Sequence, residues 1–488
     1  MSLQIYNTRT KQKEIFKSFR EGKVSMYVCG PTVYDLLHIG NFRGVIFFNC
    51  VRHWLEQSGY EVTFALNYTD IDDKIIARAA EKNISPTELT AFYIQAYQDD
   101  LRLLNLKPHD INPKCTDHID DIIALITKLI SDGFAYEVAG SVFFDVHKFK
   151  DYGKLSGKRL DDLDAGHRVD PHPDKRHPFD FVLWKPSKDK EPFWESPWGN
   201  GRPGWHIECS AMCHAHLGEH VDIHGGGIDL IFPHHENEIA QSECFTGKSF
   251  VSFWMHHNFI RFGEEKMSKS LGNVIKARDY METYHPEVLK YLLLSVHYRS
   301  ELSVETKQSY QCISALTRVY SALRDADSLA NDNAVATDEF MGVIKSTYQL
   351  VKTSLNDDFN TPKAFAAIFE CVRSFNHEVT SKKPKDVTLQ GAARFFVACI
   401  REIGGYFSLF QEEPVLFLKS LDQIMVKQLN LNVAYIEDLL VQRSHARANK
   451  DFKKADDIRE ELLAKNVLVH DSRDGTTWEI NKHFESSQ

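Results

Sequence analysis

A strand–loop–helix–strand pattern near the start of the chain constrains the fold most strongly. Residues 24–28 (VSMYV) form a short apolar run typical of a buried strand, and residues 42–57 have the apolar spacing of a helix. Residues 60–66 (YEVTFAL) predict the next strand. Strands joined by a helix in this way form a right-handed βαβ unit of a parallel sheet. Ligands of such sheets bind at the carboxyl ends of the strands, where residues 29–41 (CGPTVYDLLHIGN) begin.

The composition is that of a globular protein which needs no covalent cross-links. The chain has 488 residues, 43% of them hydrophobic, and no apolar run approaches the roughly 18 residues of a membrane span, so we expect no membrane association. The N-terminal MSLQIYN lacks the features of a signal peptide, which predicts a cytoplasmic protein. The 9 cysteines include no Cys-x-x-Cys pair, which argues against a disulfide framework and a ribbon-type zinc module. A net charge of −10 argues against indiscriminate coating of nucleic acid but allows a local basic face.

Changes in sequence texture predict five segments. We expect a Rossmann-like α/β domain with a parallel sheet in two halves, 1–114 and 203–300, separated by a proline-rich and charged insertion at 115–202. Helical spacing predicts an α-helical bundle over 301–425. A charged helical stretch begins at residues 443–450 within the last segment, 426–488, which we expect to form a small C-terminal domain.

The tetrad His38-Ile39-Gly40-Asn41 stands at the predicted loop-to-helix junction. Free backbone N–H groups and the helix dipole favour a phosphate there, and the glycine permits close approach of a nucleotide. His38 and Asn41 can both donate to phosphate oxygens. A helix N-terminus with one incidental histidine explains the tetrad equally well, because short motifs match by chance.

A second motif, Lys266-Met267-Ser268-Lys269-Ser270, is followed by Leu-Gly-Asn. Two lysines three residues apart, flanked by small hydroxyls and a glycine, predict a mobile cationic loop that stabilises charge growing on a pyrophosphate leaving group. Taken alone, a solvated basic loop is the commoner explanation. The presence of both motifs, in this order on one α/β chain, strongly favours nucleotide chemistry.

Several longer stretches extend this pattern along the chain: CGPTVYDLLHIGNFR, NYTDIDDKI, GWHIECSAM, DIHGGGIDLIFPHHENEIAQSE and KMSKSLGN. With a parallel-sheet frame and a helical C-terminal part, the chain resembles the class I aminoacyl-tRNA synthetases, and within them the cysteinyl-tRNA synthetase family. The resemblance covers essentially the whole chain. Asn41 stands where the general class I signature has a second histidine, and its amide can still donate a hydrogen bond.

The resemblance implies that Cys29, Cys209, His234 and Glu238 hold one Zn²⁺, which reads the substrate thiolate and so rejects serine without an editing domain. His234 and Glu238 are four residues apart and would share one face of a helix. The residues alone do not select these four from 9 cysteines and 23 histidines. Most such residues are structural, and the same region is crowded with others: Cys213, His206, His214, His216, His220, His224 and His235.

Further candidates lie around the stretch HGGGID, which ends at Asp229. We expect Gly227 and Asp229 to contact the nucleotide, and Asp229 could accept from a ribose hydroxyl or pair with the substrate ammonium; a tight turn capped by Asp229 is the structural alternative. By resemblance Trp205 is a wall of the cysteine pocket, although a core tryptophan would look the same. The aspartates of residues 70–73 predict a helix cap, with Thr69 as a further substrate candidate.

The resemblance implies a two-step reaction on cysteine and ATP. The cysteine carboxylate attacks the α-phosphate of ATP, with His38, Asn41, Lys266 and Lys269 stabilising the phosphates and Mg²⁺ assisting, and the terminal ribose of tRNA-Cys then takes the cysteinyl group. The family also suggests a monomer. Two alternatives stay open: a ligase that passes cysteine to a small aminosugar, which would have little use for a long C-terminal tail, and an inactive zinc-stabilised RNA-binding paralogue, against which both intact motifs count.

Overall fold

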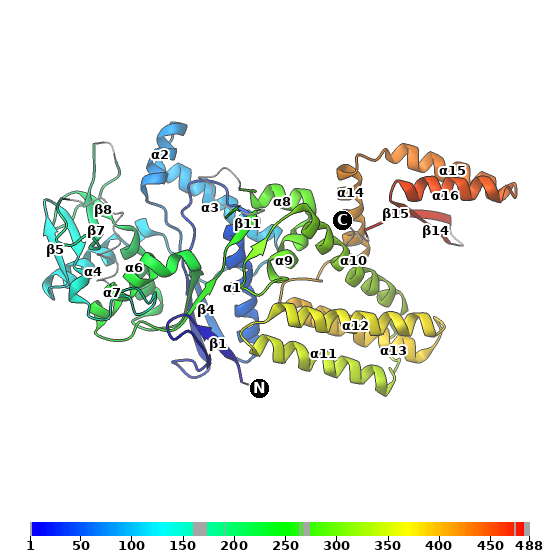
Figure 1. The fold of residues 1–488 in the computed structure, drawn as a ribbon, viewed down its shortest axis with the longest axis horizontal. Helices are drawn as coiled ribbons and strands as arrows, with labels where there is room; N and C mark the ends of the chain where they lie inside the picture. Colours follow the sequence, from blue (N-terminus) through cyan, green and yellow to red (C-terminus); the bar gives the residue numbers. More distant parts are fainter. Residues whose placement is uncertain are drawn as a thin grey trace. The chain divides into compact units, whose positions relative to one another are not determined.

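The computed structural model divides into two compact units (Figure 1). The first comprises Met1–Ile260, His297–Leu302 and Leu355–Asn360, and the second comprises Arg261–Val296, Ser303–Ser354 and Thr361–Gln488. The structure describes residues 2–159, 173–189, 191–262, 265–266, 274–472 and 475–482.

A 4-stranded parallel sheet lies at the centre of the first unit, in the strand order β10-β9-β3-β4. Its strands are β3 (Lys23–Val28), β4 (Glu61–Leu66), β9 (Val221–Gly227) and β10 (Val251–His257). The helix α1 (Ile39–Gln57) joins β3 to β4, which lie side by side in parallel. The predicted βαβ unit and the Rossmann-like sheet are therefore confirmed.

The helix α1 begins three residues before the apolar spacing indicated, because its first turn carries a polar cap. His38 is the N-cap residue, and its backbone N–H donates to Asn41 Oδ1 at 3.1 Å. Buried Arg43, one turn further along, donates to the backbone carbonyls of Asn258, Phe259 and Ser300. These charge-assisted hydrogen bonds fix the amino end of α1 against the chain that follows β10.

The chain beyond β4 forms two capped helices, α2 (Asp73–Lys82) and α3 (Pro86–Leu103). Asp72 caps α2 by accepting from the N–H of Lys74 at 2.9 Å, which confirms the expected cap in this aspartate cluster. An antiparallel hairpin of β1 (Gln4–Asn7) and β2 (Gln12–Ile15) precedes the sheet.

A second sheet in the first unit is antiparallel, with the 4-stranded order β5-β6-β7-β8. It is built from β5 (Ala135–Val138), β6 (Ser141–Phe144), β7 (Phe181–Pro186) and β8 (Gly201–Pro203). Its buried side chains share one apolar core with those of α4 (Ile119–Ser131) and α6 (Trp205–Leu217). A short helical turn, η1 (Cys115–Asp117), precedes α4, and a second one, η2 (Val146–Lys148), follows β6.

The second unit is mainly helical. The predicted helical C-terminal part is therefore confirmed. Its helices are α8 (Ala277–Tyr284), α9 (Pro286–Leu294), α10 (Thr306–Leu329), α11 (Asp338–Asn356, whose last two residues fall in the first unit), α12 (Thr361–Ser381), α13 (Val387–Gly405) and α14 (Pro414–Gln428). Short strands are β11 (Ile260–Phe262), β12 (Glu265–Lys266) and β13 (Leu302–Ser303). The chain then forms α15 (Val433–Ala448), α16 (Phe452–Ala464) and a hairpin of β14 (Val467–Ser472) and β15 (Gly475–Ile480). Within the described ranges, no helix has both the length and the hydropathy to cross a membrane.

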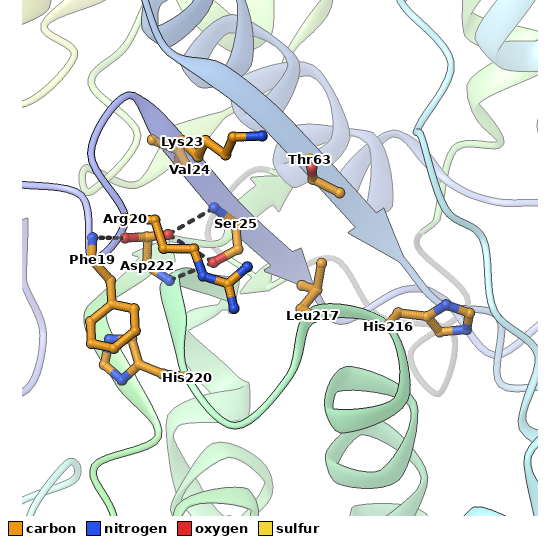
Figure 2. A pocket seen from close by; sticks show the side chains of 10 residues that line it. All are labelled: Phe19, Arg20, Lys23, Val24, Ser25, Thr63, His216, Leu217, His220 and Asp222. Carbon is orange, nitrogen blue, oxygen red and sulfur yellow. Dashed lines mark hydrogen bonds between the residues drawn. The ribbon is translucent and has the colours of Figure 1, made fainter.

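A pocket of about 120 Å³ lies at the amino-terminal edge of the parallel sheet (Figure 2). Its buried carboxylate, Asp222 at the start of β9, accepts from the backbone N–H groups of Phe19 (2.5 Å) and Ser25 (2.8 Å) and from Ser25 Oγ (2.8 Å). The Phe19 ring packs against His220, with ring centroids 4.4 Å apart. Asp222 thus ties the segment before β3 to β9, and its partners are donors that do not titrate near neutral pH.

Candidate metal and nucleotide site

A cluster of thiol, imidazole and carboxylate groups lies at the opposite, carboxyl edge of the parallel sheet. Cys29 directly follows β3, and Cys209 lies on α6. His234 belongs to the irregular helical turn η4 (Ile231–His235), and Glu238 lies on the next helix, α7 (Glu236–Thr246). One ligand atom from each of the four residues lies within 4.8 Å of the others. The structure therefore brings together the four residues that the family resemblance implied.

Distances within this cluster are those of groups that converge on one point. Cys29 Sγ lies 3.7 Å from Cys209 Sγ and 3.3 Å from Glu238 Oε1, and His234 Nε2 lies 3.1 Å from the same Glu238 oxygen. Cys209, His234 and Glu238 are at most 2% exposed. Buried sulfur, nitrogen and carboxylate donors at this spacing are a donor set that suits zinc.

The electrostatics favour negative charge on two of the ligands, Glu238 and Cys209, and a proton on a third, His234, because Glu238 raises the pKa of His234 to about 10 against the effect of burial. Burial alone would raise the pKa of Glu238, but His224 and His234 hold that pKa well below its usual value. A hydrogen bond from Cys29 lowers the pKa of the Cys209 thiol to about 6, although burial opposes this shift. Burial raises the pKa of Cys29 itself. A buried carboxylate beside a thiol that ionises readily provides the negative charge that a divalent cation would neutralise.

Groups outside the four ligands hold them in place. His224 Nε2 lies 2.9 Å from Glu238 Oε2, and the Trp205 ring stacks on His234 with centroids 4.3 Å apart. Asn67 Oδ1 accepts from the N–H of Gly30 at 2.8 Å, which fixes the loop that follows Cys29. Such outer contacts orient metal ligands and tune their basicity.

The geometry also contains an overlapping donor set, formed by Cys29, His224, His235 and Glu238, whose ligand atoms again lie within 4.8 Å of one another. His235 Nε2 faces this set, 3.3 Å from Cys29 Sγ, while its Nδ1 lies 2.7 Å from Nε2 of His256. Burial lowers the pKa of His235 and of His256, so both imidazoles are neutral. The set with two thiols is the better zinc site, since thiolates bind Zn²⁺ strongly.

Sequence reasoning did not assign His256, which lies in the segment 203–300 that was predicted only as the second half of the α/β domain. His256 Nδ1 lies 2.7 Å from Thr8 Oγ1, so a buried row of hydrogen bonds leads from Cys29 through His235 and His256 to the N-terminal hairpin. The signal that could have found it is a pair of adjacent histidines at the carboxyl end of a strand.

The residues of the first motif lie where the loop meets α1. Asn41 uses its side-chain oxygen to accept from the His38 N–H, which leaves its NH₂ group to donate. A Cβ on Gly40 would come within 2.9 Å of the His38 ring, so only glycine leaves this ring in place. The tetrad therefore has a structural role in addition to any contact with phosphate.

The other residues that we expected to contact substrate differ in their exposure and in the groups that they contact. Trp205 is 43% exposed, which disfavours the alternative that it is a core tryptophan. Thr69 is buried, and its carbonyl accepts from the N–H of Val33 at 3.2 Å. A Cβ on Gly227 would lie 2.5 Å from Asp229 Oδ1, so Asp229 folds back over this glycine, as the tight-turn alternative requires.

The second motif is only partly visible. Lys266 ends β12, and the structure describes its backbone but not its side chain. Residues 267–270, including Lys269, lie outside the described residues.

Comparison with known proteins identifies the class. Residues 15–313 match the model of the tRNA synthetases class I (C) catalytic domain. Residues 351–411 match the DALR domain, and residues 433–478 match the cysteinyl-tRNA ligase anticodon binding domain. Methionyl-tRNA synthetase of Mycobacterium tuberculosis in complex with methionyl-adenylate has a similar fold, with a TM-score of 0.60 and 16% identity over 81% of this chain and 93% of that one. Sheet, site and matched models together define a class I aminoacyl-tRNA synthetase.

Relatives of the whole chain identify the family. A cysteine–tRNA ligase of Bdellovibrio bacteriovorus is 49% identical over 98% of this chain and 100% of its own length. A cysteine–tRNA ligase of Syntrophotalea carbinolica is 45% identical over 98% of this chain and 99% of its own length. The chain belongs to the cysteinyl-tRNA synthetase family.

Proposed function

We propose that the chain is an ATP-dependent cysteine–tRNA ligase that forms cysteinyl-adenylate and then transfers the cysteinyl group to tRNA-Cys. The observation that carries this proposal is the convergence of Cys29, Cys209, His234 and Glu238 at the carboxyl edge of the parallel sheet. Relatives that share nearly half of the sequence over its full length support the same activity.

These four residues would hold one Zn²⁺, and their two sulfurs, imidazole and carboxylate, all buried except the half-buried Cys29, fit that ion. Bound zinc supplies a soft Lewis acid that accepts a substrate thiolate and discriminates strongly against a serine hydroxyl. A pocket that sensed size alone would discriminate by only about 1–3 kcal/mol. No separate editing domain is then required.

The protein's own residues would bind and orient the reactants. His38 and the NH₂ group of Asn41 would donate to the ATP phosphates beside the amino end of α1, where Gly40 permits close approach. Lys266 and Lys269 would neutralise charge that grows on the departing pyrophosphate, with Mg²⁺ as its partner ion.

The amino acid would lie between the ligand cluster and the nucleotide. The exposed ring of Trp205 provides one wall, and Thr69 is a further contact. Gly227 and Asp229 would contact the nucleotide or the substrate ammonium. The reaction needs no protein nucleophile, since placing the substrate carboxylate in line with the α-phosphate and stabilising the phosphate charge lower the barrier.

The domain assignment follows the same proposal. Residues 1–114 and 203–300 form the catalytic domain around the insertion 115–202, while 301–425 and 426–488 contact the tRNA. The matched DALR and anticodon binding models support the role of these two C-terminal segments. We further propose that the protein acts as a cytoplasmic monomer.

A charging assay tests the function. Purified protein is incubated with ATP, Mg²⁺, total tRNA and radiolabelled cysteine or serine, and label is counted in the acid-precipitated, base-labile fraction. We expect label from cysteine and none from serine. Transfer of label to an aminosugar, or tRNA binding without consumption of ATP, would replace the proposal by one of the two alternatives.

The Lys269→Ala variant tests the assigned role of the second motif. We expect this variant to lower the rate of adenylate formation by about 100-fold or more, as loss of one transition-state donor does, while its affinity for cysteine stays within about twofold. Pyrophosphate exchange and equilibrium binding of cysteine measure the two quantities. Equal losses in both would contradict a role confined to the transition state.

A further inference from the structure

A second group of metal-ligating side chains lies in the antiparallel part of the first unit and shares no residue with the cluster around Cys29. His147 lies in the turn η2 that follows β6, Asp145 caps this turn, and His177 comes from the segment that leads into β7. One ligand atom from each of the three residues lies within 4.8 Å of the other two. The site proposed for the ligase reaction does not use any of them.

One buried carboxylate holds the two segments in register. Asp180 is 1% exposed, and its Oδ1 accepts from the N–H of Val146 at 3.1 Å. Its Oδ2 accepts from the N–H of His177 at 3.1 Å and from the hydroxyl of Tyr136 at 2.6 Å. The backbone next to His147 and the backbone of His177 are therefore fixed by the same group, so the convergence of the two rings is built into the fold.

The three donors are only partly engaged. Asp145 is 6% exposed, and its Oδ1 accepts from the N–H of His147 at 3.1 Å. Within the part of the chain that the structure describes, Asp145 Oδ2 and the ring nitrogens of both histidines have no hydrogen-bond partner. The centroids of the two imidazole rings lie 3.9 Å apart, with the ring planes tilted by 43°. The two imidazoles are not hydrogen-bonded to each other. Together with the nearby carboxylate oxygen, they can provide three ligands for one metal ion.

Nearby positive charge is the main opposing factor. Lys148, Lys175 and Arg176 flank the donors in sequence. The Arg176 guanidinium lies over the Tyr136 ring at 4.0 Å instead of pairing with Asp145, and Lys148 is exposed to solvent, which screens its charge. Burial lowers the pKa of Lys175, and the carboxylate of Asp180 opposes this shift.

We propose that Asp145, His147 and His177 bind a divalent transition-metal ion, which joins the turn after β6 to the segment before β7. Two imidazoles and one carboxylate suit Zn²⁺, Co²⁺ or Ni²⁺, and leave coordination positions open to water. His147 is exposed and the set has no thiolate, so this site binds more weakly and exchanges faster than the cluster around Cys29. The ion stabilises the antiparallel sheet without taking part in the ligase reaction.

Cobalt titration of the zinc-loaded full-length protein tests this inference. Loosely held metal is first removed with a weak chelator, and Co²⁺ binding is then followed by calorimetry together with the absorption spectrum. We expect one equivalent of Co²⁺ to bind with weak d–d absorption, as nitrogen and oxygen ligands produce. Strong thiolate-to-cobalt charge-transfer absorption would instead report replacement of zinc at the cysteines. If Co²⁺ binding produced only this charge-transfer absorption, the proposal would be overturned.

Single-residue variants assign the ion to these donors. His147→Ala and His177→Ala should each weaken Co²⁺ binding by about tenfold or more, whereas His377→Ala, a change of an exposed histidine on α12, should leave it unchanged. Circular dichroism and the zinc content of each variant confirm that the protein is folded. The same affinity in both cluster variants as in the unchanged protein would refute the assignment.

A second histidine pair provides the sharpest competing explanation. His118 Nε2 and His216 Nε2 lie 2.8 Å apart at the surface of the same unit. Loss of Co²⁺ binding in His216→Ala, with binding retained in His147→Ala, would place the ion on that pair and overturn the proposal. We expect the reverse pattern.

Discussion

Glu238 and Asp222 are buried carboxylates near opposite edges of the same parallel sheet, and their partners differ in kind. Glu238 lies within 3.3 Å of Cys29, His224 and His234, all of which carry metal-ligating atoms. Among the residues that the structure describes, Asp222 accepts only from backbone N–H groups and one serine hydroxyl (Figure 2). Burial of a carboxylate is common to both edges, so the chemistry of its partners is what separates a ligand site from a structural brace.

The two carboxylates are also stabilised in different ways. A carboxylate satisfied by fixed neutral donors stabilises the fold, and no ligand is needed to complete it. A carboxylate packed among thiols and imidazoles lies in a cluster whose charge depends on protonation and on any bound cation. We therefore expect substitutions at the two edges to affect different measured quantities.

The largest effect should follow Glu238→Gln. The neutral amide removes the buried negative charge and one expected ligand, so the affinity for zinc should fall by at least about 100-fold, the upper end of what even outer-shell changes cost. Zinc content after dialysis against a chelator measures the loss, and cysteine-dependent pyrophosphate exchange should fall with it.

Glu236→Gln is the matched control for this change. Glu236 lies two residues earlier on α7, is fully buried, and accepts from the backbone N–H groups of Leu155 and Ser156. This variant should keep its zinc. If Glu238→Gln also kept a full equivalent through dialysis, the distinction between the two kinds of carboxylate would fail.

A smaller effect, on stability alone, should follow Asp222→Asn. The asparagine amide keeps one acceptor oxygen. Its NH₂ group would face another donor, either the N–H of Phe19 or the donors of Ser25, so at least one hydrogen bond is lost. We expect a loss of about 1–3 kcal/mol in the free energy of unfolding of the first unit. Denaturant titration measures this loss, with zinc content unchanged. Loss of zinc from this variant would show that the two edges are coupled.

The last effect depends on pH and concerns a third buried carboxylate, Glu287 in the helical unit. Burial raises its pKa to about 7, while Tyr320 Oη donates to Oε2 at 2.9 Å and the Phe410 N–H donates to Oε1 at 3.1 Å. Folded protein then binds more protons than the unfolded chain between about pH 4.5 and 7. Stability should therefore fall as pH rises through this window and stay lower above it.

Glu287→Gln removes this titration. From pH 5 to pH 8 the variant should gain about 1–3 kcal/mol relative to the unchanged protein, as measured by thermal unfolding at both pH values. Glu282→Gln, a change of an exposed residue on α8, is the control and should follow the unchanged protein. A constant difference between Glu287→Gln and the unchanged protein would mean that Glu287 is ionised across the whole range.

Much of the fold around the site could be predicted from local pattern. Apolar spacing placed β3, α1 and β4, and the aspartate cluster predicted the cap of α2. The helix α1 begins earlier than predicted, because its N-cap is a histidine that is hydrogen-bonded to the Asn41 side chain and gives no apolar signal in the sequence. These features depend on neighbours within a few residues, so local sequence contains the information that they need.

The ligand cluster shows the limit of such reasoning. Family resemblance selected Cys29, Cys209, His234 and Glu238, but spacing alone did not separate them from His224 and His235, and the structure shows that these two also reach the cluster. His256 was not assigned at all, because its partners Thr8 and His235 are distant in sequence.

By itself, the sequence determined the parallel-sheet class, the helical C-terminal part and the family, because these follow from short-range periodicity and from motifs that can be recognised in one dimension. Tertiary structure alone decided which buried carboxylate lies among thiols and imidazoles and which among backbone donors. It also brought Asp145 and His147 to His177 through the buried carboxylate of Asp180. The physical reason is that hydrogen-bond and metal-ligand chemistry acts over a few ångströms in space, whereas the residues involved are up to 248 positions apart along the chain.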